Sequence, residues 1–375
     1  MSRPQGSERE ICFVYVGTLD FRGRLQKEIT TLQQVGFRCR LLLGNIGERE
    51  VDASRFAFPI EVAPVPAYRG KLAFHFKTLW FGWKTGRMLA ESDCETVICL
   101  GLEALPAGIF AKRKRPGLKV VFDSNELHLE AIMSRVKRLL WRPWQRLGIR
   151  AADAILHAEP NRMDYFKRKH GGRDKPQAVL ENFPRHYSGN GGRERFSEKR
   201  VRVLYLGALG KDRYTEELVE IGRALGDRIS LDLVGFATPE FMAELESKHG
   251  MNPSEHVRIL PPVAYEEIPA LLSGYDIGLA FYMHTGLNNY FCAPNKIYDY
   301  FMGGMPVITN SFPGLKKVVE EGRLGACIDE VSPASFERAL DRIIDGRMWE
   351  NITEEVRWKY SWDAQEEEFV RFVAP

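Results

Sequence analysis

Short apolar runs alternate with amphipathic stretches along the first half of the chain. The runs have the length of buried strands, and the stretches between them repeat apolar positions with a helical period. The predicted strands are 11–16, 39–43, 96–100, 119–124, 153–158 and 178–182, and the predicted helices are 24–35, 71–91, 104–114, 133–150 and 160–170. Such alternation is typical of a parallel sheet covered by helices on both faces.

A polar, glycine-rich segment, HYSGNGGRERFSEKR (186–200), interrupts this pattern and indicates an interdomain linker. Beyond it the alternation restarts, with strands at 201–207, 230–235, 257–260, 276–282 and 306–309 and helices at 214–225, 238–249, 295–302 and 332–344. We therefore predict two Rossmann-like, doubly wound α/β domains, the first over 1–190 and the second from 191 to 355. Open sheets of this kind bind ligands at the carboxyl ends of their strands, so we expect the site in a central cleft between the domains.

Composition supports two globular domains, because the chain has 375 residues, 44% hydrophobic and 27% charged. The net charge of +3 hides a division between the halves. Residues 1–190 hold 32 Lys and Arg against 20 Asp and Glu, a net +12, whereas residues 191–375 hold 21 against 30, a net −9. The first half is therefore expected to face something anionic, such as a phospholipid surface, a lipid-diphosphate acceptor, a polyanionic glycan or a nucleic acid.

Two stretches of the first half combine basic residues with aromatic residues. RVKRLLWRPWQRLGIR (135–150) has two tryptophans and no acid. The stretch 71–89 places five apolar residues on one helical face: Leu72, Phe76, Leu79, Trp80 and Trp83. Basic residues beside interfacial aromatics are typical of a peripheral membrane contact. The stripe at 72–83 also fits a buried core face, which is the more frequent role of such a stripe. No recognised nucleic-acid motif accompanies the charge, which argues against a nucleic-acid partner.

The six cysteines form no Cys-x-x-Cys pair and mostly lie in strand-like runs. This usage favours buried free thiols in a reducing compartment. The first ten residues, MSRPQGSERE, are polar, and no apolar run approaches the ~18 residues that span a bilayer. We therefore expect a cytoplasmic protein that touches a membrane, if at all, from its inner face.

The sequence argues against two common classes of cofactor-binding protein, those that bind dinucleotides and those with a P-loop. After the first strand the chain offers VGTLDFRGRLQKE, in which Gly17 and Gly23 are too far apart for a dinucleotide fingerprint. The segment GALGKDR (207–213) lacks the spacing and the hydroxyl of a phosphate-binding P-loop. No Asp-x-Asp occurs anywhere, so a metal-chelated diphosphate is unsupported, and we predict no metal and no cofactor.

The stretch APNKIYDYFMGGMPVIT (293–309) contains residues that could bind an anion and a sugar diol. Lys296 lies at the start of a predicted helix, where free backbone N–H groups already favour a diphosphate. Asp299 follows one turn later on the same face and can accept two hydrogen bonds from a ribose, while Tyr298 and Phe301 point to the core. The same residues also fit a helix start with a solvated Lys–Asp pair.

This stretch resembles the donor-site signature of family-4-like (group 1) retaining glycosyltransferases with the GT-B fold. SFPGLKKVVEEGRLGACID (311–329), FDSNELH (122–128) and LHAEPNRMDYFKRKHG (156–171) are similar to further segments of that family. KYSWDAQEEEF (359–369) resembles its C-terminal helix, which implies that 356–375 packs back on the first domain. The likeness covers nearly the whole chain.

The resemblance implies site residues on both domains. For the donor these are Asn295, Lys296, Asp299, Arg213, Lys211, Gly207 and Asn289. Arg213 and Lys296 would pair with the diphosphate as the sugar bond breaks, which with Asn125 makes the expected catalytic set. Gly23, Arg24, Glu126 and His128 are expected on the acceptor side.

The chain departs from the family pattern at three places. Phe291 stands where the family has the carboxylate that contacts the sugar, so Asn288 or Asn289 is the alternative contact. Asn125 stands where the family has a histidine, so no titrating group is carried over there, and His128 lies nearby. The glycine-rich N-terminal loop is reduced to Gly17 and Arg22–Arg24.

We therefore expect a metal-independent, retaining transferase that moves a sugar from a nucleotide-diphosphate sugar to a glycan or lipid-linked acceptor in cell-surface polysaccharide or glycolipid synthesis. The rival is a catalytically silent GT-B-like binding protein, which the missing carboxylate and histidine would suit. A sugar-nucleotide epimerase or a phosphorylase on the same fold is a second rival, separated by its products.

Overall fold

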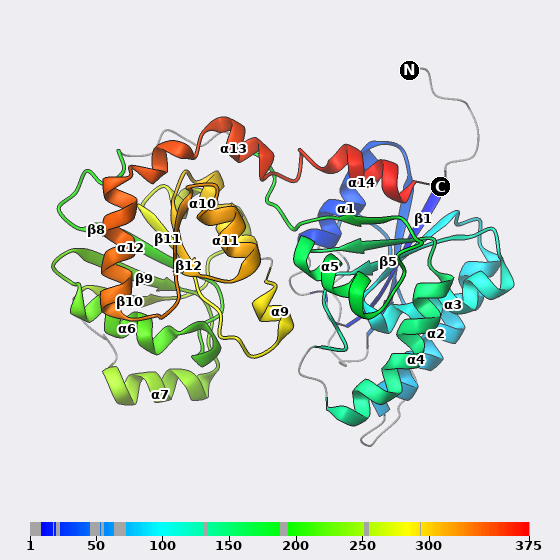
Figure 1. Ribbon diagram of the computed structural model, residues 1–375. Helices are drawn as coiled ribbons and strands as arrows, with labels where there is room; N and C mark the ends of the chain where they lie inside the picture. The colour runs from blue at the N-terminus through cyan, green and yellow to red at the C-terminus, as the bar shows by residue number, and fades with distance from the viewer. Residues whose placement is uncertain are drawn as a thin grey trace. The chain divides into compact units, whose positions relative to one another are not determined.

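The computed structural model describes residues 9–374 apart from 18, 20–22, 46–52, 54–55, 64–72, 131–133, 188–193, 251–254 and 293. The chain divides into two compact units (Figure 1): unit 1 is residues 1–181 with 365–375, and unit 2 is residues 182–364. The sequence had placed the boundaries at 190/191 and 355/356. Part of the expected linker, 188–193, lies outside the described residues.

Unit 1 is built on a parallel sheet with the strand order β3-β2-β1-β4-β5-β6-β7. Its strands are β1 (Glu10–Val16), β2 (Arg38–Gly44), β3 (Ile60–Val62), β4 (Thr96–Leu100), β5 (Lys119–Ser124), β6 (Ala154–His157) and β7 (Gln177–Val179). Every residue of β1 and β4 is buried, as expected for central strands covered on both faces.

The helices of unit 1 are α1 (Gly23–Gln34), α2 (Ala73–Glu91), α3 (Leu105–Lys114), α4 (Arg135–Ala151), α5 (Pro160–Lys169) and α14 (Glu366–Val373). Helix α2 packs on α3 through glycines: a Cβ on Gly82 would lie 2.5 Å from Pro106 Cβ, and one on Gly86 would lie 2.6 Å from Phe110 Cβ. The buried residues of α2 are Thr78, Phe81, Gly82, Thr85, Gly86 and Leu89, and no described residue of the aromatic stripe is among them. The core interpretation of the stripe is wrong at Phe76 and Trp83, which are 52% and 45% exposed.

Unit 2 has a second parallel sheet with the order β10-β9-β8-β11-β12-β13. The strands are β8 (Val201–Leu206), β9 (Ile229–Val234), β10 (Val257–Leu260), β11 (Ile277–Ala280), β12 (Val307–Asn310) and β13 (Gly325–Ile328). The helices are α6 (Thr215–Ala224), α7 (Pro239–His249), α8 (Ile268–Leu272), α9 (Leu287–Tyr290), α10 (Asn295–Met302), α11 (Pro313–Val319), α12 (Pro333–Asp345) and α13 (Glu354–Lys359).

Successive residues of a strand pack alternately in two separate hydrophobic cores, one on each face of this sheet. Val203 and Tyr205 of β8 pack in a cluster with side chains of α6, α7 and α12. Leu204 lies in the other cluster, which contains side chains of α8, α10 and α11. The period of two in β8 thus matches a doubly wound sheet.

The C-terminal segment differs from the single helix expected over 356–375. It consists of the end of α13, a turn, and α14. Trp362 in the turn is fully buried, and its backbone N–H donates to the Pro184 carbonyl at 2.7 Å within unit 2. Only from Gln365 does the chain rejoin unit 1, where Glu366 accepts a 2.6 Å hydrogen bond from Thr31 Oγ1.

Apart from the single C-terminal helix, each predicted strand and helix is present. The sequence missed short elements that depend on neighbours: β3, β13, α8, α9, α11 and α13. All six cysteines are free and buried, as predicted. Among the helices that the structure describes, none is long and apolar enough to cross a bilayer.

Candidate functional site

Three donor-site residues predicted from the sequence converge at the carboxyl edge of the unit 2 sheet. Gly207 directly follows β8, Arg213 ends the next loop, and Lys296 lies in the first turn of α10, after β11. Because β8 and β11 are neighbouring parallel strands, their carboxyl ends lie side by side. The strand order therefore places these residues together.

The Lys296 ammonium lies against two aromatic rings. Its Nζ lies 4.1 Å above the ring centroid of Tyr205 and 5.6 Å from that of Tyr282. A Cβ on Gly207 would lie 3.0 Å from this Nζ, and Gly207 has a φ of +133°, so glycine leaves the space that the ammonium occupies. Within the described residues no side chain caps the start of α10. The Ile297 N–H donates to the Pro294 carbonyl at 3.3 Å, so the N–H groups of Asn295 and Lys296 are the ones that suit an anion.

Arg213 and Lys296 both contact the ring of Tyr282. The guanidinium Cζ lies 4.6 Å from the Tyr282 centroid, and Nη1 is 2.5 Å from Asp212 Oδ2. Burial, and next the charge of Arg213, lower the pKa of Lys296 to about 7. Two cations held close together without a full set of counter-charges are what a diphosphate would neutralise.

Asp299 is buried on α10, 9% exposed, in a setting that the sequence did not reveal. Burial and the charge of Asp299 raise the pKa of the Tyr187 phenol to about 12. Asp299 also acts weakly on Lys296, in the direction of a higher pKa. The Asp299 carboxylate is therefore within electrostatic reach of the Tyr187 phenol and of the Lys296 ammonium.

The remaining predicted donor residues have local roles. Lys211 Nζ is bound to Glu244 Oε1 at 2.7 Å. Asn289 Nδ2 donates to the Met283 carbonyl at 2.9 Å and to Thr285 Oγ1 at 3.0 Å, so it holds its own loop. Asn295 is exposed at the start of α10.

The predicted acceptor-side residues of unit 1 differ in exposure and in their partners. Gly23 is exposed at the start of α1. Arg24 is bound in a buried ionic triad, with Nε 2.7 Å from Glu28 Oε1 and Nη2 2.8 Å from Asp123 Oδ1. Burial raises the pKa of Glu28 to about 7. The guanidinium of Arg24 is thus occupied by core carboxylates.

Asn125, Glu126 and His128 follow β5 at the carboxyl edge of the unit 1 sheet. The Asn125 carbonyl accepts a 2.7 Å hydrogen bond from Arg162 Nη1, which fixes its backbone. Glu126 is exposed. His128 Nδ1 lies 3.7 Å from Glu103 Oε2, a neighbour that sequence reasoning missed. Nothing in the local sequence signals this pair, because Glu103 follows a different strand.

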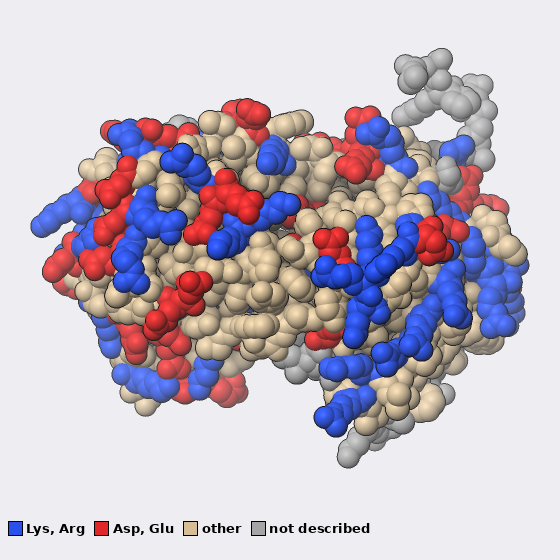
Figure 2. All heavy atoms as spheres, in the orientation of Figure 1, with Lys and Arg blue, Asp and Glu red and all other residues tan. Residues whose placement is uncertain are grey.

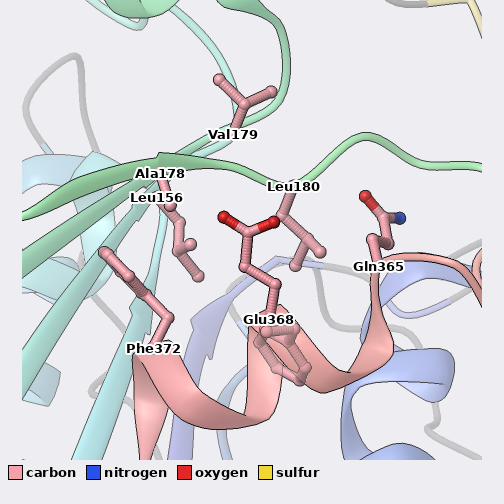
Figure 3. Close-up of a pocket in the computed structure, with 8 residues that line it drawn as sticks. Leu156, Ala178, Val179, Leu180, Gln365, Glu368 and Phe372 are labelled. Carbon is pink, nitrogen blue, oxygen red and sulfur yellow. The ribbon is translucent and has the colours of Figure 1, made fainter.

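A small hollow elsewhere in unit 1 lies between β6, β7 and α14. Figure 3 shows Leu156, Leu180 and Phe372 around it, with the Glu368 carboxylate toward the strands. It has room for about one water molecule. We interpret it as a packing seam under α14, because it is apolar and too small for a sugar.

Comparison with known proteins gives the class of unit 2. Residues 200–346 match the family model described as glycosyl transferases group 1. No curated protein matches the chain.

Solved structures give the fold of the whole chain. Sucrose-phosphate synthase from Thermosynechococcus elongatus has a TM-score of 0.74 at 14% identity, covering 97% of this chain and 98% of that chain. Anabaena HepE in complex with UDP and glucose has a TM-score of 0.72 at 15% identity, covering 97% and 99%. WaaG, a glycosyltransferase involved in lipopolysaccharide biosynthesis, has a TM-score of 0.68 at 13% identity, covering 97% and 100%. The protein therefore carries a group 1 glycosyltransferase domain on a chain with the GT-B fold.

Proposed function

We propose that the protein transfers a sugar from a nucleotide-diphosphate sugar to a glycan or lipid-linked acceptor, with retention at the anomeric carbon and without a metal. The observation that carries this proposal is the convergence of Lys296 and Arg213 on Tyr282 beside the start of α10. The solved structure of HepE with UDP-glucose supports a nucleotide sugar as donor.

The geometry accounts for how these residues would act. A diphosphate at the start of α10 would meet backbone N–H groups, Lys296 and Arg213. Negative charge grows on this group as the bond to the sugar breaks, so the cations would bind the transition state more tightly than the ground state. Asp299 would hold the ribose diol. No carboxylate pair is required, because the leaving phosphate can accept the proton of the acceptor hydroxyl.

The direct test is a thermal-shift screen of the full chain with UDP, GDP, ADP and their sugars, followed by transfer assays with the donor that binds. We expect stabilisation by one nucleotide diphosphate and its sugar, and transfer or slow hydrolysis of that sugar. Binding without any turnover would favour the silent binding protein instead, and interconversion of the sugar would favour an epimerase.

Turnover should survive excess EDTA, and the anomer of the product should match that of the donor. The reason is that the chain has no Asp-x-Asp chelator, and two side-chain cations can take the place of a metal at the diphosphate. NMR of the fresh product measures the anomer. An enzyme that EDTA inactivates, or an inverted product, contradicts this assignment.

Nucleotide binding should weaken as the pH rises above 7. A diphosphate binds the ammonium form of Lys296, whose pKa is about 7 in the free protein, and binding raises that pKa. Affinity should therefore fall by about one order of magnitude between pH 7.5 and 9, with proton uptake on binding, as measured by calorimetry in two buffers. Lys296→Arg should abolish the pH dependence. A flat profile in the wild-type protein would show that Lys296 does not contact the phosphates.

We further propose that the protein works at the cytoplasmic face of a membrane, building a cell-surface polysaccharide or glycolipid. The support is a basic patch on α4, made of exposed Arg135, Lys137, Arg138, Arg142, Arg146 and Arg150. Figure 2 shows Lys and Arg gathered where Figure 1 places α4. Val136 and Leu139 between them are 62% and 73% exposed, as in helices that lie on anionic lipid.

Liposomes with acidic lipid should retain the protein at low salt and release it as the salt concentration rises. Reversing Arg138, Arg142 and Arg146 to Glu should abolish retention without changing nucleotide affinity. The matched control reverses three exposed cations of unit 2, Lys199, Lys317 and Arg338. Equal binding to neutral and acidic liposomes would remove the membrane proposal.

A further inference from the structure

One buried side chain of α10 bridges two strands at the sheet edge that carries the candidate donor site. Tyr300 is fully buried, and its hydroxyl accepts a 3.0 Å hydrogen bond from the Leu206 N–H at the end of β8. The same hydroxyl lies 3.1 Å from the Leu279 carbonyl of β11 and 3.4 Å from the Leu204 carbonyl of β8, and it can donate to one of them. The phenol therefore joins α10 to both strands.

The phenol takes the place of a strand partner. The paired register of β8 and β11 ends at Tyr205 and Leu279, so the Leu206 N–H lies beyond the last pair. Glycine at position 278 makes room for the ring, because a Cβ on Gly278 would lie 2.2 Å from Tyr300 Cδ2. Burial raises the pKa of the Tyr300 phenol well above its ordinary value, so the hydroxyl keeps the proton that it donates. A side chain of α10 thus completes the hydrogen bonding of two strand ends.

Tyr300 holds the backbone between two residues that contact the Lys296 ammonium. Lys296 Nζ lies 4.1 Å from the ring centroid of Tyr205 and 3.0 Å from the position of a Cβ on Gly207. Leu206, whose N–H donates to the phenol, stands between these two residues in the chain. Lys296 and Tyr300 are four residues apart on α10, so they lie on one face of the helix. Helix α10 therefore meets the end of β8 at two points one turn apart, through the phenol and through the ammonium.

We propose that Tyr300 is a positioning residue of the donor site, whose hydroxyl fixes the end of β8 against α10 and so holds the Lys296 ammonium where a diphosphate meets it. This inference rests on the proposed function, since it concerns the same site. Tyr300 acts through Lys296 and not on the substrate, because its side chain is fully buried. Without the hydroxyl, the Leu206 N–H and the Leu279 carbonyl lose a buried partner, and the end of β8 must shift to regain one.

Tyr300→Phe tests this role on the full chain, because it removes one oxygen and keeps the ring that fills the space over Gly278. UDP, GDP and ADP are each titrated by calorimetry, and the nucleotide that binds the wild-type protein is used throughout. At pH 6 Lys296 is charged, since its pKa in the free protein is about 7. We expect the affinity of the variant at this pH to be about tenfold lower, the effect of leaving a buried hydrogen-bonding group without its partner.

The pH profile gives a readout that a purely structural hydroxyl would not change. Burial is the main cause of the low pKa of Lys296, so a loosened site should raise that pKa toward its ordinary value. The affinity of Tyr300→Phe should therefore fall by no more than about twofold between pH 7.5 and 9, whereas that of the wild-type protein falls by about one order of magnitude. The variant leaves unchanged the charged and titratable groups around Lys296: Arg213, Asp212, Cys292, Asp299, Tyr205 and Tyr282.

Tyr275→Phe is the matched control. The Tyr275 hydroxyl donates to Asp232 Oδ2 at 2.6 Å, and Tyr275 precedes β11, at the amino edge of the same sheet. The control therefore removes a buried phenol hydroxyl of unit 2 without altering the carboxyl edge. We expect lower thermal stability in both variants, but only Tyr275→Phe should keep the nucleotide affinity and the pH profile of the wild-type protein.

A double-mutant cycle with Lys296→Met shows whether the hydroxyl acts through the ammonium. If it does, Tyr300→Phe should lower affinity by no more than about twofold once Lys296→Met is present. The full tenfold loss in that background overturns this inference, and so do wild-type affinity and pH profile in Tyr300→Phe alone; both results leave the proposed transferase intact. An unfolded Tyr300→Phe protein also overturns it, because the fold and not the site would then require the hydroxyl. Absence of nucleotide binding in the wild-type protein instead overturns the proposed function, and this inference with it.

Discussion

Replacing Lys296 or Arg213 by alanine should lower kcat/KM by about 10²- to 10³-fold, with much of the loss in kcat. Each change deletes a charge-assisted contact to a phosphate whose charge grows in the transition state. Because Lys296 packs over Tyr205, Lys296→Met, which keeps the chain length, should show the same kinetic loss without disturbing that packing. Steady-state kinetics with the identified donor measures both parameters.

Asp299 should behave differently from the two cations. Contacts to a ribose are made equally in ground and transition states, so Asp299→Ala should mainly weaken nucleotide binding. Asp299→Asn keeps the shape and one accepting oxygen, and should fall between alanine and wild type. Because Asp299 is buried, the thermal stability of both variants must be compared with that of the wild-type protein.

The control for these variants is Lys248→Ala, which removes a cation of α7 paired with Glu216 and Glu244 on the surface. It should leave the kinetics and the thermal stability close to those of the wild-type protein. If Lys296→Ala and Arg213→Ala both bind the nucleotide diphosphate and turn over like wild type, the donor site lies elsewhere.

Arg24→Ala should destabilise unit 1 by about 3–5 kcal/mol at pH 8, because it leaves Glu28 and Asp123 buried without their cation. The pKa of Glu28 is already about 7, above its ordinary value of 4.5, and loss of Arg24 raises it further. A carboxyl with a raised folded-state pKa supports folding when protonated and loses that support as pH rises. The loss should therefore be smaller at pH 5 than at pH 8, as measured by thermal unfolding.

The matched control is Arg38→Ala, which removes an arginine 58% exposed beside Glu10 and should cost less than about 1 kcal/mol. A stable Arg24→Ala protein with impaired transfer would instead support the acceptor-side role inferred from the family resemblance. Loss of stability would make Arg24 a structural residue.

The local patterns of the sequence were sufficient for the longer strands and helices of both units. Helix α10 was predicted over its observed bounds, Asn295–Met302, and β4 and β5 likewise. Strand and helix periods depend on the backbone of a few consecutive residues, so they can be read without tertiary contacts. The position of Lys296 at a helix start followed from the same local signals.

The short elements could not be predicted locally, because they form through pairing or packing with a neighbouring element. Strand β13 is four residues long and begins with Gly325, where a Cβ would lie 2.0 Å from the Val307 carbonyl oxygen of β12. Its apolar run becomes a strand because β12 pairs with it. Likewise, the buried face of α2 was decided by the close approach of Gly82 and Gly86 to α3, which left Phe76 and Trp83 exposed.

The site itself was only partly visible in the sequence. Residue types at 213 and 296 indicated cations for a diphosphate, but Tyr282, which both of them contact, carried no local signal. The binding of Arg24 to Asp123, 99 residues away, was equally invisible. The sequence by itself determined the elements and the residue types at their ends. Only the tertiary structure decided which ends meet, because strand order sets those contacts and no local period encodes it.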